Sequence, residues 1–187
     1  PDCCELGAEP VVTVSASYNK EIEWLAGRGY NLLGVRFPAV FKGKKDNVQG
    51  SFLSVLWENL TDPIITGREE LGFSKIYCEL PEPRITGDEA QCFAGWLGFQ
   101  FLDISVNNLK PKENDPAPAK ADAPKRDPKI QTGTLHYKYM PKTGEWGTED
   151  IAYPVLTPAT GGNRKVTEHL VGDGTVTWNK ARWEDLP

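Results

Sequence analysis

The sequence predicts a mainly β protein with a closed or nearly closed antiparallel architecture. Two observations support this: apolar and polar residues alternate in several short runs, and turn-forming residues separate these runs. Helical periodicity is confined to two short segments, so helix is the minor component. Many strands joined by short turns favour a sheet that closes on itself, because closure leaves few unpaired strand edges.

Five segments have the residue pattern of strands. Most of them alternate, as half-buried strands do, whereas 95–106 is an almost continuous apolar run. The alternation in 135–140 predicts that His136 points away from the apolar face. The five segments are 11–18, 51–57, 95–106, 135–140 and 175–178. The turn sequences are Lys42-Gly43-Lys44, Lys142-Thr143-Gly144, Gly161-Gly162-Asn163 and Asp173-Gly174.

Two short helices are predicted. Residues 19–26 begin with an asparagine, which is a good N-cap, and Gly27 follows as a stop signal. In the second helix, over 62–71, Asp62 is a suitable N-cap and Pro63 suits the first helical position, where no N–H is needed. Gly72 can then take the left-handed conformation just past the helix end.

Composition excludes several classes of function. The 187 residues are 39% hydrophobic and 25% charged, which is typical of a globular protein with one sizeable core. The net charge of −5 argues against a nucleic-acid partner, and no long apolar run predicts a membrane span. No secretory leader is visible, so we expect a cytoplasmic protein. Four cysteines without metal-ligand spacing and two isolated histidines predict no metal site.

One segment differs from the rest of the chain. Residues 107–129 contain five prolines and four alanines, with charges of both signs and almost nothing apolar to bury. Such a segment cannot offset the entropy cost of ordering, so we expect a mobile hairpin loop. We interpret it as an insertion in a single domain of residues 1–187. An inert insertion is favoured over a lid that covers an active site.

Lys75 is the candidate reactive residue. It follows the second predicted helix and precedes the apolar run 76–78. A lysine in apolar surroundings is costly to charge, so its amine can be neutral and nucleophilic, as Schiff-base chemistry requires. The negative end of the preceding helix opposes this by about 0.3–1 kcal/mol when the charge is exposed. Burial in a dry site would outweigh that term.

The motif around Lys75 resembles the signature of the acetoacetate decarboxylase family. The motif is Gly67-Arg68-Glu69 followed by Gly72-Phe73-Ser74-Lys75. The order of the flanking segments is also similar to the family, from Tyr30-Asn31 through the strand that ends at Trp57. The resemblance extends over 11–187, and it implies a closed barrel-like or cone-like antiparallel fold with two or three short helices, assembled as a homo-oligomer.

The resemblance also implies a cofactor-free lyase that acts on a keto acid. Lys75 would attack the ketone, and the resulting imine would accept the electrons released as carbon dioxide departs. Arg68 and Glu69 would support catalysis, although a structural ion pair or a backbone brace is the commoner role for such residues. The substrate-binding positions that the resemblance implies are Tyr30, Leu32, Phe73 and Ile76.

Three positions depart from the family pattern. Ile76 stands where the decarboxylases have a second lysine, and Ser74 stands where they have a proline. Leu32 replaces the glutamate of the family's Tyr-x-Glu motif, and an apolar side chain cannot transfer a proton. The alternatives to decarboxylation are therefore aldol condensation, dehydration or cyclisation in secondary metabolism through the same lysine, and small-molecule binding without catalysis.

Overall fold

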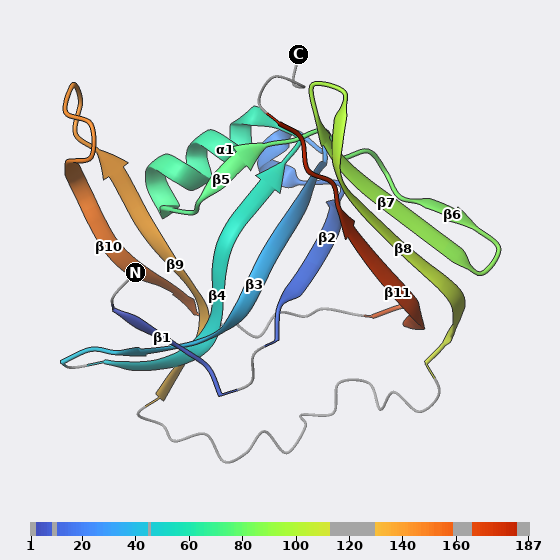
Figure 1. The fold of residues 1–187 in the computed structure, drawn as a ribbon, viewed down its shortest axis with the longest axis horizontal. Helices are drawn as coiled ribbons and strands as arrows, with labels where there is room; N and C mark the ends of the chain where they lie inside the picture. The colour runs from blue at the N-terminus through green and yellow to red at the C-terminus, as the bar shows by residue number, and fades with distance from the viewer. Residues whose placement is uncertain (1–2, 9–10, 45, 113–129, 159–165, 183–187) are drawn as a thin grey trace. The chain divides into compact units, whose positions relative to one another are not determined.

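The computed structural model describes residues 3–8, 11–44, 46–112, 130–158 and 166–182. The chain divides into two compact units, and each unit is built on one β-sheet (Figure 1). The first unit comprises Pro1–Tyr77 with Arg126–Thr160, and the second comprises Cys78–Lys125 with Gly161–Pro187. All the residues of the sequence motif therefore belong to the first unit.

The first unit holds a seven-stranded mixed sheet. Its strand order is β1-β3-β4-β9-β10, with β2 also paired to β3 and β5 also paired to β4. Strand β4 runs parallel to both β5 and β9, and the other pairs are antiparallel. The strands are β1 (Cys4–Leu6), β2 (Thr13–Asn19), β3 (Tyr30–Lys42), β4 (Asn47–Glu58), β5 (Lys75–Tyr77), β9 (Ile130–Pro141) and β10 (Glu149–Pro158).

This sheet is strongly curled but open (Figure 1). The prediction of a mainly β protein is confirmed. The prediction of a closed antiparallel barrel is not: the sheet is a half-barrel, because among the described residues β10 pairs only with β9. Two of the pairings are parallel because helical or long connections, rather than tight turns, link those strands.

The second unit holds a four-stranded antiparallel sheet in the order β11-β8-β7-β6. Its strands are β6 (Arg84–Thr86), β7 (Glu89–Trp96), β8 (Phe99–Pro111) and β11 (Leu170–Trp178). The apolar run 95–106 is therefore not one strand. Leu97 and Gly98 have φ of 49° and 82°, so they form a tight two-residue hairpin turn between β7 and β8.

The segment predicted to be a mobile hairpin loop lies mostly outside the described residues, from 113 to 129. The strands on either side of it are β8 and β9. They belong to different sheets, so the segment does not close a β-hairpin. The prediction of a single domain over residues 1–187 stays a prediction.

Helices are short, as predicted, but only one is in the predicted place. Helix α1 (Thr61–Thr66) continues into the π-helical turn η2 (Gly67–Leu71), and Gly72 ends it with φ of 76°. Leu60, rather than Asp62, occupies the N-cap position. The helix predicted over 19–26 reduces to the 3-10 turn η1 (Glu23–Leu25), because Asn19 pairs with Tyr30 in the β2–β3 ladder. No helix in the described parts of the chain is long and apolar enough to cross a membrane.

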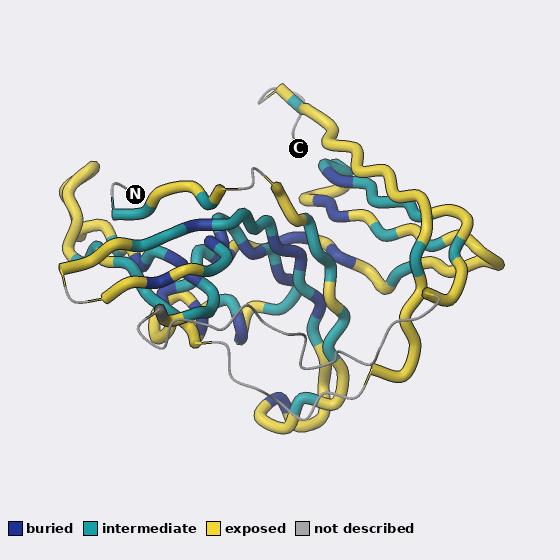
Figure 2. Tube along the Cα trace, turned by 90° about the horizontal axis from the view of Figure 1, so that it is seen from below, coloured by how far each residue is buried: buried dark blue, intermediate teal, exposed yellow. Residues whose placement is uncertain are grey.

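The core of the first unit lies where β3, β4 and β9 meet. Ala39, Val48, Phe52 and Leu135 form a buried cluster there, and Figure 2 shows the buried residues of this unit concentrated in its central strands. Strands β4 and β9 approach closely at Gly50, which lies opposite Gly133. A Cβ atom on Gly50 would overlap the Gly133 carbonyl oxygen, so a side chain does not fit at this position.

We predict that Gly50→Ala lowers the free energy of unfolding by about 1–3 kcal/mol, because the added methyl group forces β4 and β9 apart. Gly174→Ala is the matched control, since nothing lies within 4 Å of a Cβ placed there. We expect the control to change the free energy by less than about 1 kcal/mol. Urea denaturation measures both values, and equal values would contradict the close approach.

Candidate active site

The backbone that leads to Lys75 is fixed at two points. Gly72 reverses the chain in a left-handed conformation, and Lys75 then begins β5 in parallel register with Leu56 of β4. Arg68 donates a hydrogen bond from Nη1 to the Lys75 carbonyl oxygen at 2.8 Å. Arg68 therefore braces the backbone of Lys75, which is one of the two roles that the sequence suggested.

The Lys75 side chain is buried, with 8% of its surface exposed. Its Nζ donates a hydrogen bond to the Pro63 carbonyl oxygen at 2.9 Å and lies 2.8 Å from Oε1 of Glu58. The ring centroid of Phe73 lies 5.7 Å from Nζ. The burial predicted for Lys75 is confirmed, but its surroundings are not purely apolar, because a carboxylate and a carbonyl contact the amine.

Glu58 is the residue that the sequence analysis missed. It ends β4 and has no exposed surface, and its Oε2 has no hydrogen-bond partner among the described residues. Burial raises the pKa of Glu58, while the neighbouring Lys75 opposes that shift. The available signal was a single carboxylate between the predicted strand 51–57 and the predicted helix 62–71.

Phe73 lies in the connection between η2 and β5, and the other three substrate-binding positions predicted from the sequence divide between the two faces of the sheet. Leu32 lies directly opposite Glu58 in the β3–β4 register, so a carboxylate faces the position where the family motif carries its glutamate. Tyr30 lies on the same face as Leu32, and burial together with the charge of Glu58 raises the pKa of Tyr30. Ile76 follows Lys75 in β5, so it points to the opposite face, where it is 54% exposed.

Two further residues of the motif, Gly67 and Glu69, contribute to the site without using a side chain. Gly67 has ordinary helical angles, but a Cβ atom there would overlap Cε of Lys75, so the glycine makes room for the lysine tip. Glu69 is exposed, and its carbonyl oxygen accepts a hydrogen bond from Nζ of Lys138 at 2.7 Å. The Glu69 backbone, rather than its carboxylate, therefore contacts the rest of the site.

Strand β9 contacts the segment that precedes Lys75, mainly through His136. His136 is fully buried, so the prediction that it points outward is wrong. Its ring stacks on Phe73 with centroids 4.0 Å apart, and its Nδ1 lies 3.2 Å from the Gly72 carbonyl oxygen. Since a carbonyl only accepts, Nδ1 donates, and Nε2 is left to accept from the Thr157 hydroxyl at 3.2 Å. The alternation in the sequence led to the wrong prediction because the neighbouring residue Leu135, which points to the other face of β9, is buried as well. Both faces of the strand are therefore covered at this point.

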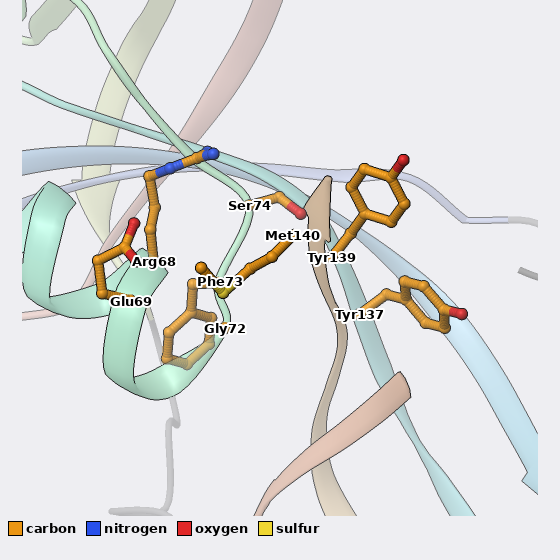
Figure 3. A pocket seen from close by; sticks show the side chains of 8 residues that line it. All are labelled: Arg68, Glu69, Gly72, Phe73, Ser74, Tyr137, Tyr139 and Met140. Atoms are coloured by element: carbon orange, nitrogen blue, oxygen red, sulfur yellow. The ribbon is translucent and has the colours of Figure 1, made fainter. Parts of the chain in front are cut away.

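A pocket of about 150 Å³ lies beside this segment. Figure 3 shows that residues of η2 and its connection to β5 line one side and residues of β9 line the other. The lining residues are Arg68, Glu69, Gly72, Phe73, Ser74, Tyr137, Tyr139 and Met140. The Lys75 amine is not among them, because it turns toward Glu58 and Pro63. Within the described residues, no group of three His, Cys, Asp or Glu side chains could hold a metal ion.

We predict that Lys75→Met lowers the free energy of unfolding by about 3–5 kcal/mol, because it leaves the buried Glu58 carboxylate unpaired. Adding Glu58→Leu should recover most of the loss, since no buried charge remains. Lys42→Met is the matched control: it breaks the exposed Lys42–Glu5 pair, at a cost of less than about 1 kcal/mol. Additive losses at 58 and 75 in urea denaturation would contradict a coupled buried pair.

We predict that stability falls as the pH falls below about 6.5, the ordinary pKa of histidine. Burial lowers the pKa of His136, so the unfolded chain takes up the proton first and acid favours unfolding until the folded pKa is passed. His136→Gln should remove this part of the pH dependence, measured as the difference from the wild type between pH 7.5 and 5.5. The same substitution at the exposed His169 should leave it intact.

Comparison with known proteins agrees with the sequence resemblance. The acetoacetate decarboxylase family model matches residues 1–187, and no curated protein sequence matches the chain significantly. Among solved structures, acetoacetate decarboxylase from Legionella pneumophila superposes with a TM-score of 0.71 at 18% identity, over 97% of this chain and 64% of that chain. This chain therefore spans less than two thirds of the Legionella protein.

Two further structures share the fold at similarly low identity. The enduracididine biosynthesis enzyme MppR, complexed with pyruvate, gives a TM-score of 0.65 at 14% identity, over 99% of this chain and 70% of that one. An acetoacetate decarboxylase-like enzyme from Sphingomonas wittichii RW1 gives 0.55 at 15% identity, over 84% and 58%. With a family match along its whole length and the motif lysine in a buried site, the chain belongs to the acetoacetate decarboxylase family.

Proposed function

We propose that this protein is a cofactor-free lyase that forms a Schiff base between Lys75 and the ketone of a small keto acid. One observation carries the proposal: the buried Lys75 amine lies 2.8 Å from the fully buried Glu58 carboxylate. A buried ion pair is often no more stable than an apolar pair of the same size. Since stability alone does not explain the pair, the position of Lys75 in the motif of a family that uses a lysine imine supports a chemical role for it.

The reaction needs only the amine and proton transfers. The neutral Lys75 nitrogen bonds to the ketone carbon, and the carbonyl oxygen leaves as water to give an iminium ion. In a β-keto acid the bond to the carboxylate then breaks, and its electron pair moves into the iminium to give an enamine and carbon dioxide. A proton adds to the enamine carbon, and water releases the ketone from Lys75. Gly67 would leave room for the lysine tip and Arg68 would hold the Lys75 backbone through this cycle.

The relatives support a small keto acid as the substrate class. MppR was solved with pyruvate, and also with the condensation product of pyruvate and imidazole 4-carboxaldehyde. An enamine on Lys75 could likewise attack an aldehyde carbon instead of taking a proton. Leu32 favours this second candidate, since the position lacks the acid of the family's decarboxylase motif. Assembly into a homo-oligomer is part of the same proposal.

The proposal predicts that borohydride traps a reduced keto-acid adduct on the Lys75 peptide when the protein is incubated with pyruvate or acetoacetate. Peptide mass spectrometry measures the adduct. Lys138 is an internal control, because it is also 8% exposed but lies outside the Glu58 pair. Lys75→Met should abolish the adduct. A folded protein that gives no adduct with either acid, or that labels Lys138 equally, would reject the proposal.

Product analysis then separates the candidate reactions. Carbon dioxide release from acetoacetate would indicate the decarboxylase, and a condensation product from pyruvate and an aldehyde would indicate the aldolase-type enzyme. Ligand-induced thermal stabilisation that survives Lys75→Met, with no adduct, would indicate a binding protein without catalysis.

A further inference from the structure

We propose that Glu58 is the proton-transfer residue of this site, a catalytic base and acid that contacts the Lys75 nitrogen directly. The inference rests on the proposed Schiff-base function and assigns the group that carries its protons. Neither the family motif nor the sequence pattern had assigned a role to this residue.

The first argument is contact. Among the residues that the structure describes, two groups lie within hydrogen-bonding distance of Lys75 Nζ: Oε1 of Glu58 at 2.8 Å and the Pro63 carbonyl oxygen at 2.9 Å. A peptide carbonyl orients the ammonium group but does not take a proton from it at neutral pH. Of the two, only the carboxylate can convert the ammonium ion into the neutral amine that attacks a ketone.

The second argument is the unpaired oxygen. Glu58 has no exposed surface, yet its Oε2 has no hydrogen-bond partner among the described residues. Leaving a buried polar atom unsatisfied costs about 1–3 kcal/mol, so a carboxylate with a purely structural role would be expected to have both oxygens bonded. Oε2 is therefore an atom that can hold a proton while Oε1 still faces the lysine nitrogen.

The third argument is the charge around the carboxylate. Lys75 of β5 and Tyr30 of β3 face Glu58. In the pairing of β4 with β5, Glu58 lies opposite Tyr77. Burial raises the pKa of Glu58, and Lys75 is the group that opposes this shift. When Lys75 gives up its proton, that opposition disappears and Glu58 retains the proton more firmly. The carboxylate is thus placed to receive the proton that the amine gives up.

The proton balance of imine formation follows from this geometry. The Glu58 carboxylate accepts two protons in turn from the lysine nitrogen and passes each to the carbonyl oxygen of the keto acid. The C–N bond forms, the C–O bond breaks, water leaves, and Glu58 is ionised again beside the iminium ion. The carboxylate can then remove a proton from the carbon next to the iminium to give an enamine. It returns a proton taken up from solvent water when the enamine is protonated at carbon.

The test measures hydrogen–deuterium exchange at the methyl group of pyruvate in D₂O by NMR, alongside borohydride trapping on Lys75. In the Glu58→Gln variant we expect exchange to fall by about 100-fold or more, because the amide cannot accept the proton. Prolonged incubation should still give the trapped adduct. Glu5→Gln is the matched control, since it removes a carboxylate from the exposed pair with Lys42 and should leave both readouts unchanged.

The pH profile adds a readout that a structural role would not change. Exchange in the wild type should rise with pH as Glu58 ionises, and this rise should be absent in Glu58→Gln. If Glu58→Gln does not fold, Glu58→Asp keeps the carboxylate one methylene farther from the amine. It should exchange more slowly than the wild type, with the rise at a different pH.

The outcomes separate the two proposals. A wild-type protein that is not trapped on Lys75 overturns both of them. A wild type that is trapped, with Glu58→Gln exchanging as fast as the wild type, overturns the role of Glu58 and leaves the Schiff base standing. In the event that only Glu58→Asp folds, an exchange rate and pH profile identical to the wild type would overturn the role of Glu58.

Discussion

The buried pair of Lys75 and Glu58 is the interaction on which the rest of the site depends. Removing two opposite charges from water costs several kcal/mol per ion unless the geometry is held tightly. Here β4 supplies the carboxylate, β5 supplies the amine and α1 supplies the Pro63 carbonyl that accepts its second hydrogen bond. The parallel register of β5 on β4 fixes the distance between the carboxylate and the amine. Gly67 is required because any side chain there would occupy the space of the lysine tip.

A second set of contacts explains why a local motif needs a strand that is distant in sequence. The carbonyl groups at the end of a helix have no partners within it, and a cation is favourable at that end. Lys138 and His136, both buried on β9, bond the carbonyls of Glu69 and Gly72 at the end of η2. The short connection to Lys75 is thereby anchored to the centre of the sheet. One of these carbonyls, that of Glu69, belongs to the π-helical turn, a form often found at functional sites.

Local patterns predicted well wherever short-range chemistry decides the outcome. The helix before Lys75, its end at Gly72 and the burial of Lys75 were all predicted, because turn residues and apolar flanks act within a few residues. Residues 19–26 show the limit. Their capping signals are outweighed by strand pairing, since Asn19 is bonded into the ladder opposite Tyr30. His136 shows another limit, because alternation predicts one exposed face, whereas β9 is covered on both faces at Leu135 and His136.

The sequence by itself determined that the protein is mainly β, that it carries the motif of the acetoacetate decarboxylase family, and that Lys75 is the residue to examine. Only the tertiary structure decided that the sheet is open and mixed, that Glu58 is the partner of Lys75, and that Ile76 faces away from it. The reason is physical. Strand register and parallel pairing bring together residues that no sequence spacing relates, and a buried charge is recognised by what surrounds it in space.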